Sequence, residues 1–318
     1  MKPSLDFIVV GAQKSGTTTL FEYLRRHPEV HLPPGKEAPF FSDEEQWSGG
    51  WELYVRRYFG GAPDGARWGT VTPQYMYGTL SRGEPDPGAR PERIVPERIA
   101  SHSPGAWLVA ILRDPVERAL SHYRMEVMRD AEQRSFADAI DELLRPEQLE
   151  RSRRSFSETA AYVTNGEFGR ILAPYFELFG RDRVHVCFSA DLEADPAGTV
   201  AEVARFIGVD GNFRPPNLGE RYRVGGSRRR LRRLDLYALQ ERVASTRPIR
   251  AAWRALPRRV RTRVDETFKE AAYQVDVRNR VAVADPEAPP PEVAARLREH
   301  YAADRETLRA LVGKEPPW

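Results

Sequence analysis

A stretch near the N-terminus, VVGAQKSGTTTL (residues 9–20), combines the residue types that bind an anion at the start of a helix. Gly11 and Gly16 allow the backbone to wrap closely around a ligand, and Lys14 adds an ammonium group. The helical pattern that begins near Thr17 offers free N–H groups and a dipole that favour negative charge. The residues expected to hold the anion are Lys14, Ser15, Gly16, Thr17, Thr18 and Thr19.

The two glycines keep the spacing of the nucleotide-binding pattern G-x-x-x-x-G-K-[ST], but the lysine does not. Lys14 precedes the second glycine by two residues, and Thr17 stands where the lysine is expected. A P-loop kinase or other NTPase therefore fits poorly but stays an alternative. An ordinary helix N-cap by Ser15 or Thr17 is a second alternative. Because the magnesium-binding hydroxyl and an acidic partner are missing, we predict no metal.

A second stretch, LVAILRDPVERALSHYRMEV (residues 108–127), places an arginine at the end of an apolar strand. Ligands of open α/β sheets bind at the carboxyl ends of strands, and Arg113 can grip a phosphate with two N–H groups. Ser121 lies about two helical turns further on. Two alternatives remain: Arg113 can pair with Asp114 or Glu117, and Ser121 can be a packing residue.

Together the two stretches resemble a known family. GAQKSGTTTL is similar to the 5'-phosphosulfate loop of sulfotransferases that use 3'-phosphoadenosine 5'-phosphosulfate (PAPS). In that family an arginine and a serine eight residues later hold the 3'-phosphate, which Arg113 and Ser121 match in type and spacing. The resemblance implies PAPS as co-substrate and transfer of its sulfuryl group to a hydroxyl, in preference to an amine, of a small-molecule, glycan or lipid acceptor.

The segment KEAPFF (residues 36–41) resembles the one that carries the general base in the heparan sulfate type of sulfotransferase. Carried over by position, the base is Glu37, and Phe40 and Phe41 would desolvate its carboxylate and raise its pKa. An exposed Lys-Glu pair is the plainer interpretation. His31 is the rival base, and it is also a candidate for the border of the acceptor site.

Two further matches concern the acceptor and the nucleotide. VTPQY (residues 71–75) resembles a segment that lines the family's acceptor site, which suggests that Thr72 and Tyr75 border the substrate. Many members carry a charged residue where this chain has Val71, so their sugar contacts need not transfer. A basic loop with glycines falls where the family closes over the nucleotide, and Arg223 and Arg228 are its candidate phosphate ligands.

These motifs require strands that end near one another. Apolar runs at residues 6–10, 107–112 and 183–188 predict strands, and helical patterns follow each. Strands alternating with helices indicate an α/β fold: a central parallel sheet flanked by helices, P-loop-like, with a helical C-terminal elaboration. Residues 30–91 are expected to be largely irregular. We predict a single domain over residues 1–318, with a proline-rich connector near 281–291 before a closing helix at 292–312.

Composition limits the function classes. The one cysteine, Cys187, excludes an intramolecular disulfide and a CxxC metal site and favours a cytoplasmic location. No apolar run is long enough for a membrane span. Seven arginines at residues 221–233 make a nucleic-acid-binding protein the third alternative, but 46 acidic residues nearly balance 49 basic ones. Arginine- and alanine-rich usage suggests a bacterial enzyme of natural-product modification. The sequence leaves the oligomeric state open.

Overall fold

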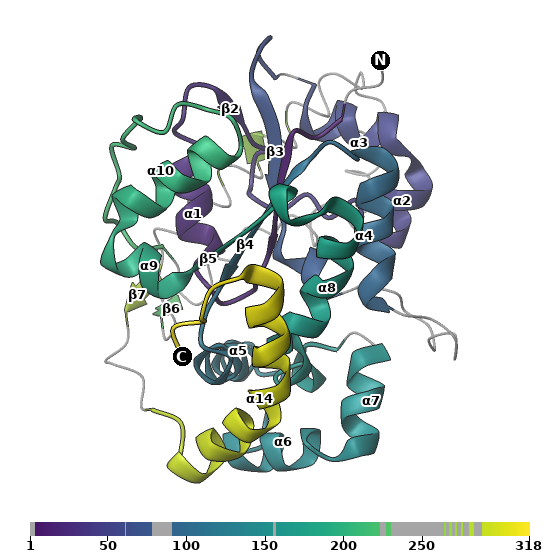
Figure 1. Cartoon of the computed structure of the whole chain (residues 1–318), viewed down its shortest axis with the longest axis vertical. Helices are drawn as coiled ribbons and strands as arrows, with labels where there is room; N and C mark the ends of the chain where they lie inside the picture. Colours follow the sequence, from purple (N-terminus) through teal and green to yellow (C-terminus); the bar gives the residue numbers. More distant parts are fainter. Residues whose placement is uncertain are drawn as a thin grey trace, which may run out of the picture.

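A five-stranded sheet lies between two layers of helices, and a further helical layer continues beyond one end of it (Figure 1). This computed structural model describes residues 4–60, 62–77, 91–154, 157–222 and 288–318. It also describes the backbone of two short paired strands, β6 (Ser227–Arg229) and β7 (Arg280–Ala282), and single helical positions at 264, 267, 268, 271 and 275.

The sheet is parallel throughout, as predicted. Its strands are β1 (Phe7–Gly11), β2 (Val30–His31), β3 (Arg67–Val71), β4 (Trp107–Leu112) and β5 (Val184–Phe188), and their order is β2-β3-β1-β4-β5. The chain adds β2 and β3 on one side of β1 and then β4 and β5 on the other. The crossover direction therefore changes at β1, and in sheets of this kind ligands bind at the carboxyl ends of the strands beside such a point.

Alternate residues of β1 supply the two cores on either face of the sheet. Phe7 and Val9 pack with α1 (Thr17–Leu24) and α10 (Pro196–Phe206) on one face. Ile8 and Val10 belong to the core of the other face, which includes residues of α4 (Pro91–His102) and α8 (Phe168–Phe179). Burial on both faces explains why β1 is a continuous apolar run.

The expectation of a largely irregular region at residues 30–91 was wrong. It contains β2, β3, α2 (Glu44–Gly49), α3 (Trp51–Tyr58) and the short 3-10 helix η1 (Pro73–Met76). β3, RWGTV, lies inside the sheet although it lacks an apolar run. Its glycine explains the sequence: a Cβ atom at Gly69 would overlap the ring of Phe7 on β1, so a β-branched residue does not fit there.

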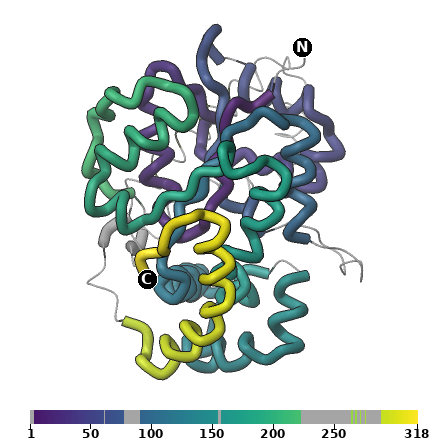
Figure 2. Tube along the Cα trace, viewed as in Figure 1, coloured from purple at the N-terminus to yellow at the C-terminus, as the bar shows by residue number. Residues whose placement is uncertain are grey.

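The helical layer beyond the sheet is built around α5 (Pro115–Met128). It packs with α6 (Phe136–Leu143) and α14 (Pro291–Val312) through an apolar core of its own, and α7 (Pro146–Arg154) lies beside it. The Cα trace shows the yellow C-terminal segment alongside the teal helices (Figure 2). The remaining short elements are η2 (Glu158–Ala160), η3 (Thr164–Gly166), η4 (Arg181–Arg183) and α9 (Ser189–Ala194).

Candidate active site at the carboxyl ends of the strands

The loop between β1 and α1 has the geometry of an anion cradle. Gly16 is the N-cap of α1 with φ 98°, and Lys14 also has a positive φ of 68°. No side chain caps the helix start, so neither Ser15 nor Thr17 serves as the ordinary cap that was the alternative. The hydroxyl of Ser15 is instead 1% exposed without a hydrogen-bond partner. Buried unpaired hydroxyls are costly and rare, which favours a ligand group at this loop.

The second motif begins where β4 ends. Arg113 donates from Nε and Nη2 to Glu117 Oε2, at 2.9 and 2.8 Å. Asp114 caps α5 by accepting from the N–H of Val116 at 2.7 Å. Ser121 is 8% exposed, and its hydroxyl has no partner. Arg113 is thus held by Glu117, one of the alternatives, at the same edge of the sheet as the loop of Lys14.

The segment that carries Glu37 contacts η1, which follows the carboxyl end of β3. Glu37 Oε1 accepts from Lys36 Nζ at 3.0 Å and its Oε2 from Gln74 Nε2 at 2.5 Å, and the side chain is 36% exposed. Lys36 is buried, so the pair is more than a surface contact. Phe40 and Phe41 belong to the hydrophobic core that α4 covers, whereas Lys36 and Gln74 hydrogen-bond to the Glu37 carboxylate.

Thr72 and Tyr75 hold the segment that carries Glu37. Thr72 Oγ1 accepts from the N–H of Ala38 at 3.1 Å, and the Tyr75 hydroxyl donates to the carbonyl of Ala38 at 2.6 Å. Both side chains are buried. These contacts give the two residues a positioning role, while their contact with an acceptor stays a prediction.

The remaining predicted site residues lie apart from these contacts or outside the description. His31 is on the edge strand β2, where its ring lies 5.9 Å from that of Phe59 and burial lowers its pKa. Arg223 lies outside the described residues. Arg228 belongs to β6, and its side chain also lies outside the description.

Four side chains that the sequence analysis did not single out form a network beside Lys14. The N–H of Gln13 donates to the Tyr77 hydroxyl at 2.5 Å, and its Nε2 lies 3.4 Å from Glu158 Oε2. Glu158 Oε2 also accepts from His122 Nε2 at 2.6 Å. Charge from Glu37 and Glu158 acts on Tyr77, whose pKa is raised mainly by burial. Both carboxylates therefore lie near Tyr77, which contacts Gln13 of the loop.

The partners of His122 determine its tautomer. Arg118 Nη1 lies 3.5 Å from His122 Nδ1, and a guanidinium can only donate. Nδ1 therefore accepts, and Nε2 carries the proton that is donated to Glu158. Burial lowers the pKa of His122 to about 4, so the ring is neutral at pH 7. Because its one lone pair faces Arg118, His122 is not a base for an acceptor.

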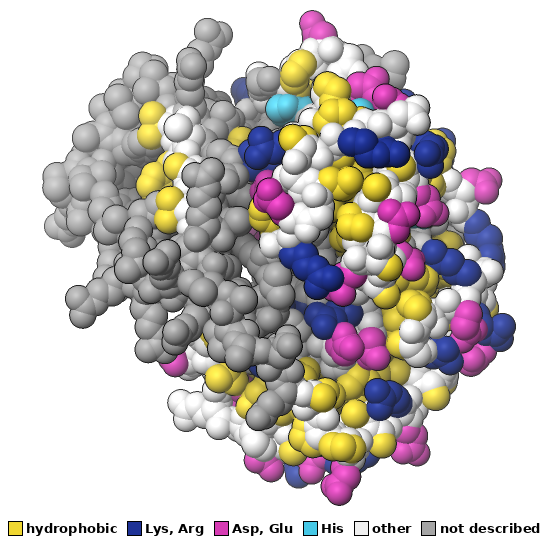
Figure 3. Space-filling view, turned by 90° about the vertical axis from the view of Figure 1, so that its left-hand side faces the viewer, with side chains coloured by type: hydrophobic (Ala, Val, Ile, Leu, Met, Phe, Trp, Pro, Cys, Tyr) yellow, Lys and Arg dark blue, Asp and Glu magenta, His cyan; other side chains and the backbone are white. Residues whose placement is uncertain are grey.

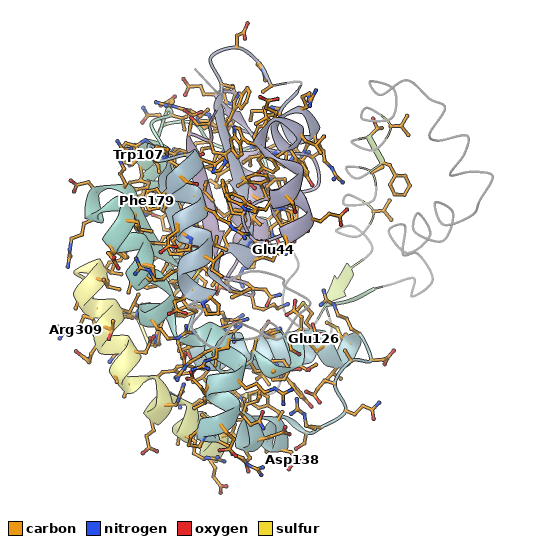
Figure 4. The ribbon with its side chains drawn as sticks, turned by 90° about the vertical axis from the view of Figure 1, so that its right-hand side faces the viewer. Glu44, Trp107, Glu126, Asp138, Phe179 and Arg309 are labelled. Atoms are coloured by element: carbon orange, nitrogen blue, oxygen red, sulfur yellow. The ribbon has the colours of Figure 1, made fainter. Side chains whose placement is uncertain are left out.

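Within the part of the chain that the structure describes, His122, Glu126 and Glu158 have the spacing of a metal site, with ligand atoms within 4.8 Å of one another. Figure 4 labels Glu126 where the helical layer meets the sheet portion. The tautomer argues against an ion, because Nε2 carries a proton where a ligand needs a lone pair. Charge from Lys14 also reaches His122 and Glu126. The residues fit a metal poorly, and its absence stays a prediction.

Comparison with known proteins identifies the family. The sulfotransferase domain matches residues 4–217. Heparan sulfate glucosamine 3-O-sulfotransferase 3B1 of Mus musculus is 27% identical over 202 residues, covering 64% of this chain and 45% of that protein. The membrane-associated sulfotransferase kil1 of Dictyostelium discoideum is 32% identical over 124 residues, 38% of this chain and 23% of its own length.

A solved structure has a similar fold. The sulfotransferase from Alicyclobacillus acidocaldarius has a TM-score of 0.64 at 21% identity, covering 99% of this chain and 98% of its own. That likeness supports the α/β fold with its parallel sheet. The chain therefore belongs to the sulfotransferase domain family, whose members use PAPS. It spans less than half the length of the 3-O-sulfotransferase that it matches.

Proposed function

We propose that this protein transfers a sulfuryl group from PAPS to a hydroxyl of a small-molecule, glycan or lipid acceptor. The observation that carries the proposal is a pair of buried hydroxyls without partners, Ser15 on the loop after β1 and Ser121 on α5. They belong to the two motifs that match the family's 5'- and 3'-phosphate elements. A bisphosphorylated nucleotide would give each hydroxyl a hydrogen-bond partner.

The chain's own groups suit the demands of such a transfer. PAPS would supply the activated sulfuryl group, and its departure leaves negative charge on a phosphate. The ammonium of Lys14 and the uncapped amides of α1 would stabilise that charge. Arg113 and Ser121 would hold the 3'-phosphate and fix the nucleotide at its other end. Gly16 is the residue that accepts φ 98° at the helix start without strain.

Glu37 is the proposed general base. Its carboxylate is oriented by Lys36 and Gln74 and remains partly exposed, so an acceptor hydroxyl can approach it. The alternative base, His31, lies on the edge strand β2 against the ring of Phe59. We therefore keep His31 as a residue bordering the acceptor site. We also keep a cytoplasmic location as a proposal.

The test compares adenosine 3',5'-bisphosphate (PAP) with ATP plus magnesium in thermal unfolding of the full chain. A ligand that binds only the folded state raises the melting temperature. We expect stabilisation by PAP that is unchanged by EDTA and is lost in Arg113→Ala. Arg93→Ala is the matched control, because Arg93 pairs with Glu97 and Glu177 on α4 and α8 and belongs to neither phosphate motif. Stabilisation only by ATP plus magnesium would favour the NTPase alternative.

The nucleic-acid alternative gains no support from the described residues on the face shown in Figure 3. On the face shown in Figure 3, the Lys and Arg side chains are interspersed with Asp and Glu and form no continuous basic stripe over the described residues. Recognition of a nucleic-acid backbone depends on such a stripe.

In the described residues, no helix is both long and apolar enough to cross a membrane.

A further inference from the structure

Helix α5 presents two neighbouring rows of side chains, and each row faces a different part of the site. Ser121 lies one turn beyond Glu117, the residue that holds Arg113, and forms the row of the 3'-phosphate motif. Arg118 and His122 lie one residue further along the helix and form a second row. This second row is almost fully buried and connects to the loop that carries Lys14.

The connection is a chain of hydrogen bonds with a fixed direction. Arg118 donates to His122 Nδ1 at 3.5 Å, and His122 Nε2 donates to Glu158 at 2.6 Å. Gln13 donates from Nε2 to the same carboxylate at 3.4 Å. A carboxylate accepts only, so it also determines which end of the Gln13 amide faces it. The amide oxygen of Gln13 is then left buried without a partner.

The charges along this chain support its rigidity. Arg118 is fully buried and also donates to the carbonyl of Tyr162. Burial by itself would raise the pKa of Glu158, but the hydrogen bonds from His122 and from the amide of Gln13 lower it below its usual value. Glu158 is therefore ionised at neutral pH. A neutral imidazole thus separates a buried cation from a carboxylate that is 29% exposed.

We propose that His122 and Glu158 are positioning residues that brace the 5'-phosphosulfate loop, through Gln13, against the helix of the 3'-phosphate site. This inference rests on the proposed function. With the brace in place, a nucleotide that docks its 3'-phosphate at Arg113 and Ser121 meets a loop already set at the right distance for its 5' end. Preorganisation of this kind makes the two phosphate contacts mutually reinforcing.

The test measures the dissociation constants of PAP and of 5'-AMP, which lacks the 3'-phosphate, by calorimetry on the full chain. In the wild type PAP should bind more tightly than 5'-AMP. The ratio of the dissociation constant of 5'-AMP to that of PAP reports how well one nucleotide uses both sites. We expect Glu158→Gln and His122→Leu to reduce that ratio about fivefold or more, the lower end of typical couplings between sites. His122→Gln keeps an N–H donor toward Glu158 and should restore most of the ratio.

The matched control is a second buried Glu-His pair, in which His300 Nε2 lies 3.0 Å from Glu167 Oε1 between α8 and α14. Glu167→Gln should lower stability without changing the ratio, which separates bracing from general loosening. Nitrogen NMR of the imidazole should find Nε2 protonated and Nδ1 unprotonated in His122 of the wild type.

The outcomes are distinguishable. An unchanged ratio in Glu158→Gln and His122→Leu would overturn the brace while PAP binding upheld the proposed function. An unprotonated Nε2, or PAP affinity that requires an added divalent cation, would also overturn the brace, because the cluster would then be a metal site. A wild type that binds PAP no better than AMP would remove the proposed function and the brace together.

Discussion

The ammonium of Lys14 is the only side-chain cation in the loop between β1 and α1, so removing it isolates one charge at the proposed point of transfer. We expect Lys14→Ala to lower sulfuryl transfer by roughly 10²- to 10³-fold, the usual effect of deleting one electrostatic stabiliser of a transition state. Labelled sulfate from PAPS measures the transfer. Lys314→Ala is the control, because Lys314 lies over the ring of Phe188 near the C-terminus. Equal loss in both variants would contradict a specific role.

Glu37 allows a test of the base that separates chemistry from binding. Glu37→Gln keeps the shape and the contact with Gln74 but cannot take a proton. We expect transfer to fall by about 10²- to 10⁴-fold, the contribution of a positioned base, with unchanged affinity for PAP. Glu45→Gln, on the exposed surface of α2, is the matched control. Full transfer by Glu37→Gln would contradict Glu37 as the base and favour His31 instead.

At the residue scale the sequence offered candidate phosphate ligands but not the residues around them. Lys14, Arg113 and Ser121 are candidates because type and spacing match a family pattern within single short stretches, and their role as ligands stays a prediction. Gln74 lies two residues after Thr72, and Gln13 lies directly before Lys14. Both are therefore sequence neighbours of residues that were predicted for the site. No local pattern indicated Glu158, because its contact with His122 forms only where η2 meets α5.

At the scale of elements, the strands that a single sequence predicts are those buried on both faces. β1, β4 and β5 are apolar runs, and each was predicted within a residue or two. β3 was missed because Gly69 and Thr70 interrupt its apolar pattern, and the reason for Gly69 is the ring of Phe7 on another strand. A contact between segments 60 residues apart leaves no local periodicity to detect.

The junction of α8 with α14 offers a prediction at this scale. Burial alone would raise the pKa of Glu167, but hydrogen bonds from His300 and Arg153 and the charge of Arg170 lower it to about 2. A carboxyl whose folded pKa is lowered stabilises the fold above its ordinary pKa near 4.5, and that stability is lost as the pH falls toward 2. We expect Glu167→Gln to cost about 2 kcal/mol at pH 7, since its arginine partners are partly exposed.

Chemical denaturation at pH 7 and pH 3 checks this expectation. The difference in unfolding free energy between wild type and Glu167→Gln should shrink at the lower pH, because at pH 3 the wild-type carboxyl is protonated in the unfolded chain but still largely ionised in the folded one. Glu177→Gln is the control, because Glu177 pairs with Arg93 on the exposed side of the same helix. A difference that is constant with pH would show that the ion pairs contribute little.

At the scale of the whole molecule, His122 predicts how stability depends on pH. The folded state holds the ring neutral with its pKa at about 4, next to Arg118, Glu126 and Glu158 and within reach of the charge of Lys14. The unfolded chain binds a proton near pH 6.5, so the folded state loses stability as the pH falls from 6.5 to 4. The loss approaches about 3 kcal/mol for a shift of this size.

Melting temperatures between pH 7 and pH 4 test this dependence. His122→Gln removes the titrating group and should flatten the curve over that interval, although its stability at pH 7 is no higher than that of the wild type. Substitution of the partly buried His102, which lies against Trp47 at the end of α4 and outside the network of His122, should leave the slope unchanged. An identical slope in wild type and His122→Gln would contradict the buried neutral imidazole.

A crystal structure of the protein with PAP tests the central claim most directly. The account predicts the 5'-phosphate on the amides of residues 14–18 with Lys14 beside it, and the 3'-phosphate on Arg113 and Ser121. Nucleotide density at any other place, with both of these phosphate sites filled by water, would contradict it.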